Sequence, residues 1–449
     1  MADTAGTARE QYPHTTWNFV VILTDASFWA FGLAFVDPVA VLPVLLVELS
    51  GSEVVVGLMG ALQRAGWLIP QLLAASFVLH RPRKKPFVFY PCLATRLPFL
   101  AAAIVLNLDY AATHRMVALL VVMGAYGAFF FGEGLVGPPW HDICARTVPP
   151  RLRGRFFGGM QFFGGLFAIA AAVIVRRVLA DDSLPFPRDY GRLFMYLFIA
   201  MMISNAFLAL IREPHGPAMA EAQSLSRIIR SIPSTLRARV RLRRAVIGQL
   251  LCHTAGMAVP FYAVYAHTQL HLPKGSGGIF VGAATVGAVG ASVVWAFLND
   301  RFGSTVVIRW TSTLVIATPV TALLVPPVAR ALAAEEWLTY MYAIVFVLNG
   351  ALWGGMWLGF TNYVLEIAPA AIRPLYLGLQ ATLLSPAILM PLLGGWLLAV
   401  ISFESLFAIV AVVGVGAVVY VRRLPEPRRG QGGMPESDPL DGPEHEPIS

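Results

Sequence analysis

Five ionisable residues stand inside long apolar stretches in the first half of the sequence: Asp25, Asp37, Arg64, Arg96 and Glu133. A charge in the middle of a bilayer costs about 2.5–3.5 kcal/mol on insertion scales, so such residues need partners. At about 1.5 Å per helical residue, Asp37 lies at the depth of Arg64, and the other three share a second layer. A buried carboxyl group can take up a proton, and a nearby arginine controls its release. The spacing predicts a proton-coupling ladder; the alternative is that these charges are structural pairs, with Arg96 compensating Glu133.

The apolar stretches themselves define the class of protein. Of 449 residues, 57% are hydrophobic and 13% are charged, which is not the balance of a soluble domain. Twelve apolar runs follow one another, each long enough to cross about 30 Å of hydrocarbon as a helix. The first run covers approximately residues 18–47, the seventh 245–270 and the eleventh 374–399. We therefore expect an all-α integral membrane protein with twelve transmembrane helices in a lipid bilayer.

The net charge of +8 could indicate either nucleic-acid binding or the topology of a membrane protein, and the positions of the basic residues distinguish the two. Most of the 33 Lys and Arg residues fall on the side of the membrane that carries both chain ends. By the positive-inside rule that side is cytoplasmic, and nucleic acid is not an expected partner. The polar start of the chain has no cleavable signal pattern, which predicts a multi-pass protein of the plasma (inner, cytoplasmic) membrane with both termini cytoplasmic. The three cysteines have no paired spacing, so we expect no disulfide, metal site or cofactor.

One segment occurs twice, 220 residues apart. Residues 140–161 align without a gap with residues 360–381, and the same offset holds far upstream. The matched pairs include Asp142 with Asn362, Pro149 with Pro369, Arg153 with Arg373, Gly158 with Gly378, Gly57 with Gly277, and Arg81 with Arg301. Two related halves are typical of secondary transporters and predict two pseudo-symmetric six-helix bundles.

The halves and their connections give the expected domain organisation: a cytoplasmic N-terminal segment at 1–16, an N-terminal six-helix bundle at 17–211, a cytoplasmic linker at 212–244, a C-terminal six-helix bundle at 245–421 and a cytoplasmic tail at 422–449. Within the linker, apolar residues recur at helical spacing from 225 to 232, which predicts a short helix on the membrane surface, with coil as the alternative. The tail is rich in Pro, Gly and acidic residues, and we expect it to be disordered.

Two motifs carry a resemblance to a known family. Residues 300–303 read Asp-Arg-Phe-Gly and are similar to the Asp-Arg-x-Gly turn of the major facilitator superfamily. Residues 363–373 resemble the Tyr-x-x-Glu-x-x-Pro-x-x-x-Arg pattern of its sugar porters. The resemblance covers residues 17–421, but residues 80–85 lack the Asp-x-x-Gly frame in the first half, so the subfamily stays unassigned.

The resemblance implies that spans one, four, seven and ten line a substrate cavity. The aromatic, amide and imidazole side chains that spans seven and ten bring are His253, Tyr262, Tyr265, Asn349, Trp353, Trp357 and Asn362. Such a surface suits a partly apolar organic solute. Ordinary packing between helices is the alternative for each of these residues.

Charged residues at the cytoplasmic ends of the helices form a predicted gate. Its members are Asp142, Arg146, Arg153, Asp300, Arg301, Glu366 and Arg373. Because a helix start carries partial positive charge, Asp300 can lie against the start of span five, near Arg153 and Gly154. The alternative is that these charges only anchor the helix ends at the lipid headgroups.

These observations predict a secondary active transporter, a monomer that moves a small organic solute by alternating access and is coupled to protons. A passive uniporter of the same fold is the nearest alternative. A polytopic membrane enzyme or receptor is the alternative from another class. His141 and Asp142 could suggest catalysis, but no nucleophile or metal set accompanies them, and no ATP-binding loop is present, so we expect no enzymatic activity.

Overall fold

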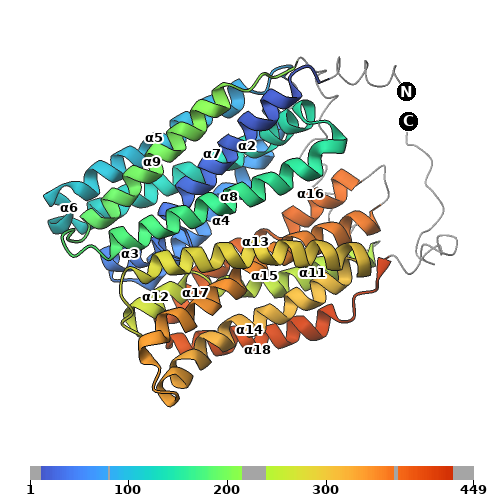
Figure 1. Ribbon diagram of the computed structural model, residues 1–449. Coiled ribbons are helices and arrows are strands. Elements are labelled where there is room, and N and C mark those ends of the chain that lie inside the picture. Colours follow the sequence, from blue (N-terminus) through green and yellow to red (C-terminus); the bar gives the residue numbers. More distant parts are fainter. Residues whose placement is uncertain (1–11, 79–80, 215–238, 369–372, 428–449) are drawn as a thin grey trace.

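The computed structural model describes residues 12–78, 81–214, 239–368 and 373–427. In these ranges all regular structure is helical (Figure 1), which confirms the expected all-α fold. Eleven of the described spans are long and apolar enough to cross a membrane. The expected second span corresponds to α4 (Glu53–Val78), which is not among the eleven because Gln63, Arg64 and Gln71 lower its hydropathy. The count of twelve is therefore not reproduced in full.

The helices of the first half pack mainly against one another, with α2 against α8 and α9, and α7 against α4 and α5. Besides α4, they are α2 (Thr15–Phe35), α3 (Leu42–Ser50), α5 (Pro86–Asn107), α6 (Asp109–Thr113), α7 (Arg115–Thr147), α8 (Pro150–Leu179) and α9 (Arg188–Ala209). We call this group the first bundle. The linker segment expected to form a surface helix lies outside the described residues, as do most of the N-terminal segment and the tail.

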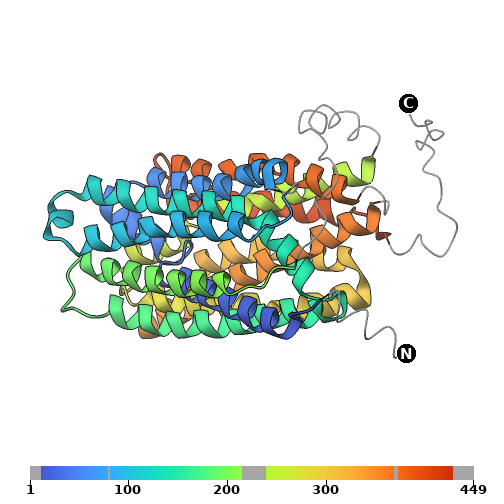
Figure 2. The ribbon, with the colours of Figure 1, turned by 90° about the horizontal axis from the view of Figure 1, so that it is seen from above.

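The second bundle is built in the same way, with α15 packed between α13 and α14, and α18 against α14. Its helices are α11 (Val240–His253), η1 (Thr254–Met257), α12 (Phe261–Thr268), α13 (Ser276–Phe302), α14 (Ser304–Ala331), η2 (Glu335–Trp337), α15 (Leu338–Ile367), α16 (Arg373–Leu383), η4 (Ser385–Leu389), α17 (Met390–Leu398) and α18 (Phe403–Val421). Figures 1 and 2 show the long helices running side by side along one axis.

The 220-residue offset of the sequence repeat relates whole helices. The fourth span covers Arg115–Thr147 and the tenth covers Glu335–Ile367, so both ends are shifted by 220 residues. The structure thus agrees with the gap-free register predicted from the sequence.

Three of the expected continuous spans are broken. The first is divided into α2 and α3, the seventh into α11, η1 and α12, and the eleventh into α16, η4 and α17. Proline favours a break, because it lacks a backbone N–H and cannot continue the helical hydrogen-bond ladder, although α7 and α14 continue through their interior prolines. Pro38 lies in the first break, Pro260 precedes α12, and Pro386 lies in η4. Broken helices at membrane depth are found where backbone lines a cavity or is buried in protein.

Among the described residues, close approach of the two bundles extends from one end of the molecule to about the middle of α8, where a Cβ atom added to Gly165 would lie 2.6 Å from Cγ2 of Val289. We call the end at which α2 begins and α18 ends the terminal end, and the opposite end the far end. In Figure 1, α8 and α13 meet at the far end and separate toward the terminal end. A Cβ atom added to Gly278 would lie 2.4 Å from the carbonyl oxygen of Ala172, and one added to Gly57 would lie 2.5 Å from that of Pro391. In contrast, a Cβ on Gly158, near the terminal end of α8, would meet nothing within 4 Å.

Within the second bundle, α13 and α15 are held together by backbone contact at two glycines. A Cβ atom on Gly287 would lie 2.1 Å from the carbonyl oxygen of Val347, and one on Gly350 would lie 2.1 Å from that of Ala284. Such small-residue contacts take the place of hydrophobic driving force between helices in lipid.

Replacing Gly287 with alanine is therefore expected to force α13 away from α15 and to cost about 1–3 kcal/mol of stability. The measurement is the thermal unfolding temperature of the purified protein. Gly290→Ala on the same helix is the matched control, because its added Cβ would meet nothing within 4 Å. An equal unfolding temperature for the two variants would contradict the packing argument.

Candidate functional site

Three of the predicted coupling residues form one buried network in the first bundle. Arg96 on α5 donates from Nη2 to Oε1 of Glu133 on α7 at 3.5 Å. Its Nη1 donates to the Ser204 hydroxyl oxygen at 3.2 Å, and that hydroxyl donates to Oδ1 of Asp25 on α2 at 2.5 Å. Arg96 also donates to the Met201 carbonyl oxygen at 3.2 Å. The structure thus brings together the three residues that the sequence placed at one depth.

Close packing of α5 on α7 explains why Arg96 and Glu133 meet. A Cβ atom at Gly132 would lie 2.3 Å from the Thr95 hydroxyl oxygen, so only glycine permits this approach. Thr95 and Gly132 are the sequence neighbours of Arg96 and Glu133. Gly132 therefore lets α7 approach α5 closely enough for Glu133 to reach Arg96.

A cavity of about 180 Å³ adjoins this network. Three tryptophans contribute to its wall: Trp29, Trp67 and Trp140. Asp25, Arg96 and Glu133 all line it, so two carboxyl groups share one guanidinium group. When both carboxylates are ionised the cluster carries one uncompensated negative charge, which favours uptake of a cation as small as a proton.

The expected pairing of Asp37 with Arg64 is not formed. Asp37 lies in the break between α2 and α3, where its Oδ1 accepts hydrogen bonds from the backbone N–H groups of Val39 and Ala40, both at 2.8 Å. Among the ion pairs of the described residues, none joins this carboxylate to Arg64. Depth along a helix fixes the height of a side chain, but here the break redirects it, and Asp37 stabilises the turn.

Arg64 instead points into a cavity of about 360 Å³ between the two bundles. Its guanidinium carbon lies 4.8 Å from the ring centroid of Trp353 on α15. Its one described hydrogen bond runs from Nη1 to the Ala387 carbonyl oxygen and is long, at 3.5 Å. We call this space the central cavity.

Of the predicted cavity residues, Trp353 lines the central cavity, and two others support it. The Trp353 indole N–H donates to Oδ1 of Asn349 at 3.1 Å, and the His253 ring packs edge-on against the indole at 5.6 Å. Tyr262 and Tyr265 are buried and pack against Phe407, inside the second bundle. The packing alternative describes these two tyrosines better.

Trp357 and Asn362 follow on α15 toward the terminal end. Trp357 is 73% exposed, and Asn362 is half-buried. Neither lines the central cavity.

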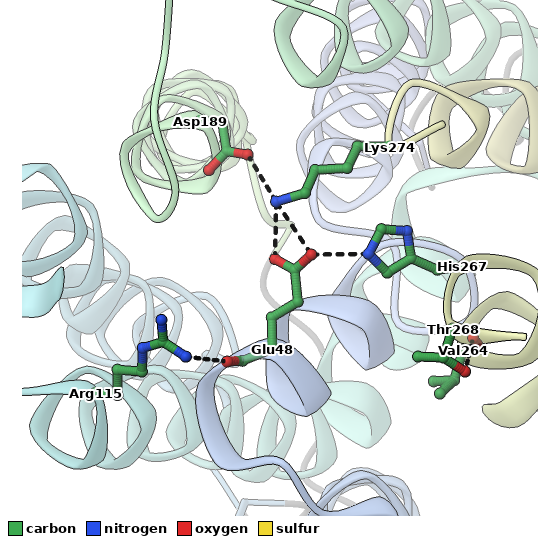
Figure 3. A network of polar contacts seen from close by, with 7 residues as sticks. All are labelled: Glu48, Arg115, Asp189, Val264, His267, Thr268 and Lys274. Carbon is green, nitrogen blue, oxygen red and sulfur yellow. Dashed lines mark hydrogen bonds and ion pairs between the residues drawn. The ribbon is translucent and has the colours of Figure 1, made fainter. Parts of the chain in front are cut away.

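At the far end, a polar network joins the two bundles (Figure 3). Glu48 on α3 accepts hydrogen bonds from Nε2 of His267 on α12 at 2.9 Å and from Nζ of Lys274, which follows α12, at 3.1 Å. Lys274 also lies 3.9 Å from Asp189 of α9, and Arg115 donates to the Glu48 backbone carbonyl oxygen at 3.4 Å. The first bundle supplies the carboxylates of Glu48 and Asp189, and the second bundle supplies Lys274 and His267, so these contacts join the two bundles at the far end.

The charges around Glu48 shift its titration. Burial raises the pKa of the Glu48 carboxyl group, but the hydrogen bond from His267 and the charge and hydrogen bond of Lys274 outweigh burial. The pKa therefore lies below its ordinary value of 4.5. The stabilisation from the charge of Glu48 is fully present above the ordinary pKa and is lost as the pH falls through the lowered pKa.

The sequence prediction missed this network. Glu48 falls just past the expected end of the first span, and Lys274 counted only as a basic residue in the topology. The signal that could have found it is the position of Glu48 just after the first span and of Lys274 just after the seventh, because these spans occupy equivalent places in the two halves.

Charged residues at the terminal end of the first bundle make local contacts. Asp142 forms an ion pair with Arg146 one turn later at 2.8 Å, and Arg146 also donates to the Pro82 carbonyl oxygen at 3.3 Å. Arg153 donates to the carbonyl oxygen of Ala145 at 2.9 Å. These contacts lie within the first bundle.

The corresponding residues of the second bundle behave in the same way. Glu366 accepts a hydrogen bond from the Ser304 hydroxyl at 2.6 Å, and the Arg301 guanidinium carbon lies 5.6 Å from the ring centroid of Phe302. Asp300 lies in the last turn of α13, next to Arg301 in the sequence. The Arg373 side chain lies outside the described part of the chain. A gate between the bundles built from these residues stays a prediction.

This architecture is similar to that of known membrane transporters. Residues 245–444 match the family model described as Major Facilitator Superfamily. The solved structure of the nucleoside transporter NupG is 14% identical, covers 91% of this chain and 99% of that chain, and gives a TM-score of 0.64. A POT family transporter in complex with 5-aminolevulinic acid is 12% identical, covers 91% of this chain and 96% of that chain, and gives 0.65. No curated protein matches the sequence.

A bacterial homologue of the iron transporter ferroportin is similar as well, with 14% identity, coverage of 91% of this chain and 98% of that chain, and a TM-score of 0.63. The chain has the fold of the major facilitator superfamily, which confirms the resemblance predicted from its motifs. Its similar structures are membrane transporters, a class whose members are generally not enzymes.

Proposed function

We propose that this protein is a secondary active transporter that moves a small organic solute by alternating access and couples the movement to protons. The observation that carries the proposal is the network of Asp25, Arg96 and Glu133, buried in one bundle beside a cavity. A helix bundle in lipid retains such charges at a cost, and in transporters they mark ion and proton pathways.

The proton step follows from the charge balance of the network. Arg96 serves two carboxyl groups, and it cannot fully compensate both. Protonation of Glu133 would release Arg96 toward Asp25, and loss of the proton would draw it back. Because the two acids sit on α2 and α7, the exchange of partners pulls on two different helices of the bundle. This links protonation to the position of the bundle.

The conformation described here is closed at the far end and parted at the terminal end. With the termini in the cytoplasm, as the positive-inside rule predicts, the central cavity would open inward. The structure of the ferroportin homologue in its inward-facing state gives a TM-score of 0.63, against 0.56 for its outward-facing state, which supports the same assignment. A second conformation must open the far end, and the network around Glu48 must then separate.

Replacing Glu48 with glutamine is expected to shift the protein toward a far-end-open conformation at neutral pH. The substitution removes the charge that Lys274 and His267 hold, as protonation would at low pH. The measurement is the distance between spin labels attached to cysteines at Asp182 and Gln269, two exposed positions beyond α8 and α12. The native cysteines are buried, so labelling is selective.

We expect the distance in Glu48→Gln to exceed that of the unsubstituted protein. Lowering the pH below the ordinary carboxyl value should lengthen the distance in the protein with Glu48 and have a smaller effect in the variant. Glu53→Gln is the control, because Glu53 is also an acid at the far end but has no part in the network. Equal distances in all three proteins would contradict the role of the network as a closure.

A further inference from the structure

The central cavity contains a positive charge that no described residue neutralises. Arg64 lies on α4, and no carboxylate of the described chain forms an ion pair with it. Its contacts are the face of Trp353 and the long hydrogen bond to Ala387. A guanidinium group has five N–H donors, so most of its hydrogen-bonding capacity is unused. A half-buried charge against an apolar wall favours a partner of opposite charge, and the cavity is where a partner can enter.

The surrounding backbone is shaped to accommodate the guanidinium group. A Cβ atom added to Gly256 of η1 would lie 2.8 Å from Nη2 of Arg64, so the side chain occupies space that only a glycine leaves free. η1 interrupts the seventh span at this place. Arg64 comes from the first bundle, whereas Gly256, Trp353 and Ala387 come from the second. A ligand bound to Arg64 would therefore contact both bundles, as the substrate of a rocking transporter must.

The rest of the cavity wall is mainly apolar. Its side chains include those of Met59, Val259, Pro260 and Pro391. The volume of about 360 Å³ falls within the range of small-molecule sites. A planar guanidinium group binds a carboxylate through two parallel hydrogen bonds. One cation in an apolar wall matches a molecule with one anionic group and an apolar body.

We propose that the central cavity binds a monocarboxylate with an apolar body, whose carboxylate pairs with Arg64 and whose body packs against Trp353. This inference rests on the proposed transport function and names the class of solute. An anion at this place neutralises Arg64 and joins the bundles, so its arrival favours closure of the cavity around it.

The test is a binding assay on the full-length protein in detergent, read as quenching of tryptophan fluorescence. The probe is 3-phenylpropanoate, compared with its neutral amide and with 3-phenylpropylamine. We expect saturable binding of the carboxylate and binding of the amide and amine that is weaker by about tenfold or more, which corresponds to about 1.4 kcal/mol. Equal binding of the carboxylate and the amide would overturn the proposal.

Two variants assign the site. Arg64→Gln should weaken binding of 3-phenylpropanoate by about tenfold or more and leave binding of the amide unchanged. Gly256→Ala keeps the charge but displaces the guanidinium group, and it should weaken carboxylate binding as well. Arg192→Gln, an equal change of charge at an exposed position of α9, should have no effect. Full affinity for the carboxylate in a folded Arg64→Gln protein would overturn the assignment.

The assay uses no pH gradient, so it fails independently of the proposed function. Carboxylate binding that depends on Arg64, without any pH-linked movement of the bundles, would leave this site standing and remove proton coupling. Movement of the bundles that depends on pH, without selectivity for the carboxylate, would leave proton coupling standing and remove this site.

Discussion

Replacing Arg96 with glutamine is expected to be the most destabilising single change in the first bundle. The substitution leaves Asp25 and Glu133 without the cation that they share. Removing one partner of a buried ion pair costs about 3–5 kcal/mol, because an uncompensated charge remains in an environment of low polarity. We expect a large fall in the thermal unfolding temperature and in the yield of folded protein.

The destabilisation should be reversed in part by removing the charges that Arg96 balances. The triple variant Arg96→Gln, Asp25→Asn, Glu133→Gln has no ionised group in the network, so its unfolding temperature should lie above that of Arg96→Gln alone. Arg192→Gln is the control for loss of a surface charge. If the triple variant is less stable than the single variant, the network contributes through its shape and hydrogen bonds, and the charge balance is not the cause.

Removing the titratable charges without removing Arg96 should uncouple the protein from pH. In the double variant Asp25→Asn, Glu133→Gln, the network has the charge state that protonation would give it. We expect folded protein in which neither uphill transport of the solute nor the opening of the two ends responds to pH. Exchange of solute across the membrane without a gradient should persist, because the central cavity is unchanged. Asp37→Asn is the matched control, since Asp37 stabilises a turn and lies outside the network.

The part of the site that sequence could predict depended on simple geometry. Asp25, Arg96 and Glu133 were placed at one depth by counting residues along helices, and the small residue Gly132 allowed α5 and α7 to approach closely enough for them to meet. The repeat at an offset of 220 residues predicted two related halves, and the fourth and tenth spans follow it at both ends.

The parts that failed needed information that depth alone does not contain. Asp37 and Arg64 lie at similar depth, but the break after α2 redirects Asp37 into a turn, whereas Arg64 faces the second bundle. Tyr262 and Tyr265 are on a span that also lines the cavity, but they lie on the face of the helix that packs against Phe407 inside the bundle. In the Glu48 network, Glu48, Asp189 and Lys274 lie just outside the apolar runs, so an analysis limited to charges in the interiors of the spans could not find it.

Protonation of the buried network is expected to move the two bundles between two conformations. The most direct test measures two distances in one sample series between about pH 8 and pH 5. One pair of spin labels at Arg151 and Phe302 reports the terminal end, and the pair at Asp182 and Gln269 reports the far end.

We expect the two distances to change in opposite directions with pH, and the double variant Asp25→Asn, Glu133→Gln to show the low-pH distances at every pH. Distances that do not change with pH, or a double variant that responds as the unsubstituted protein does, would contradict this expectation.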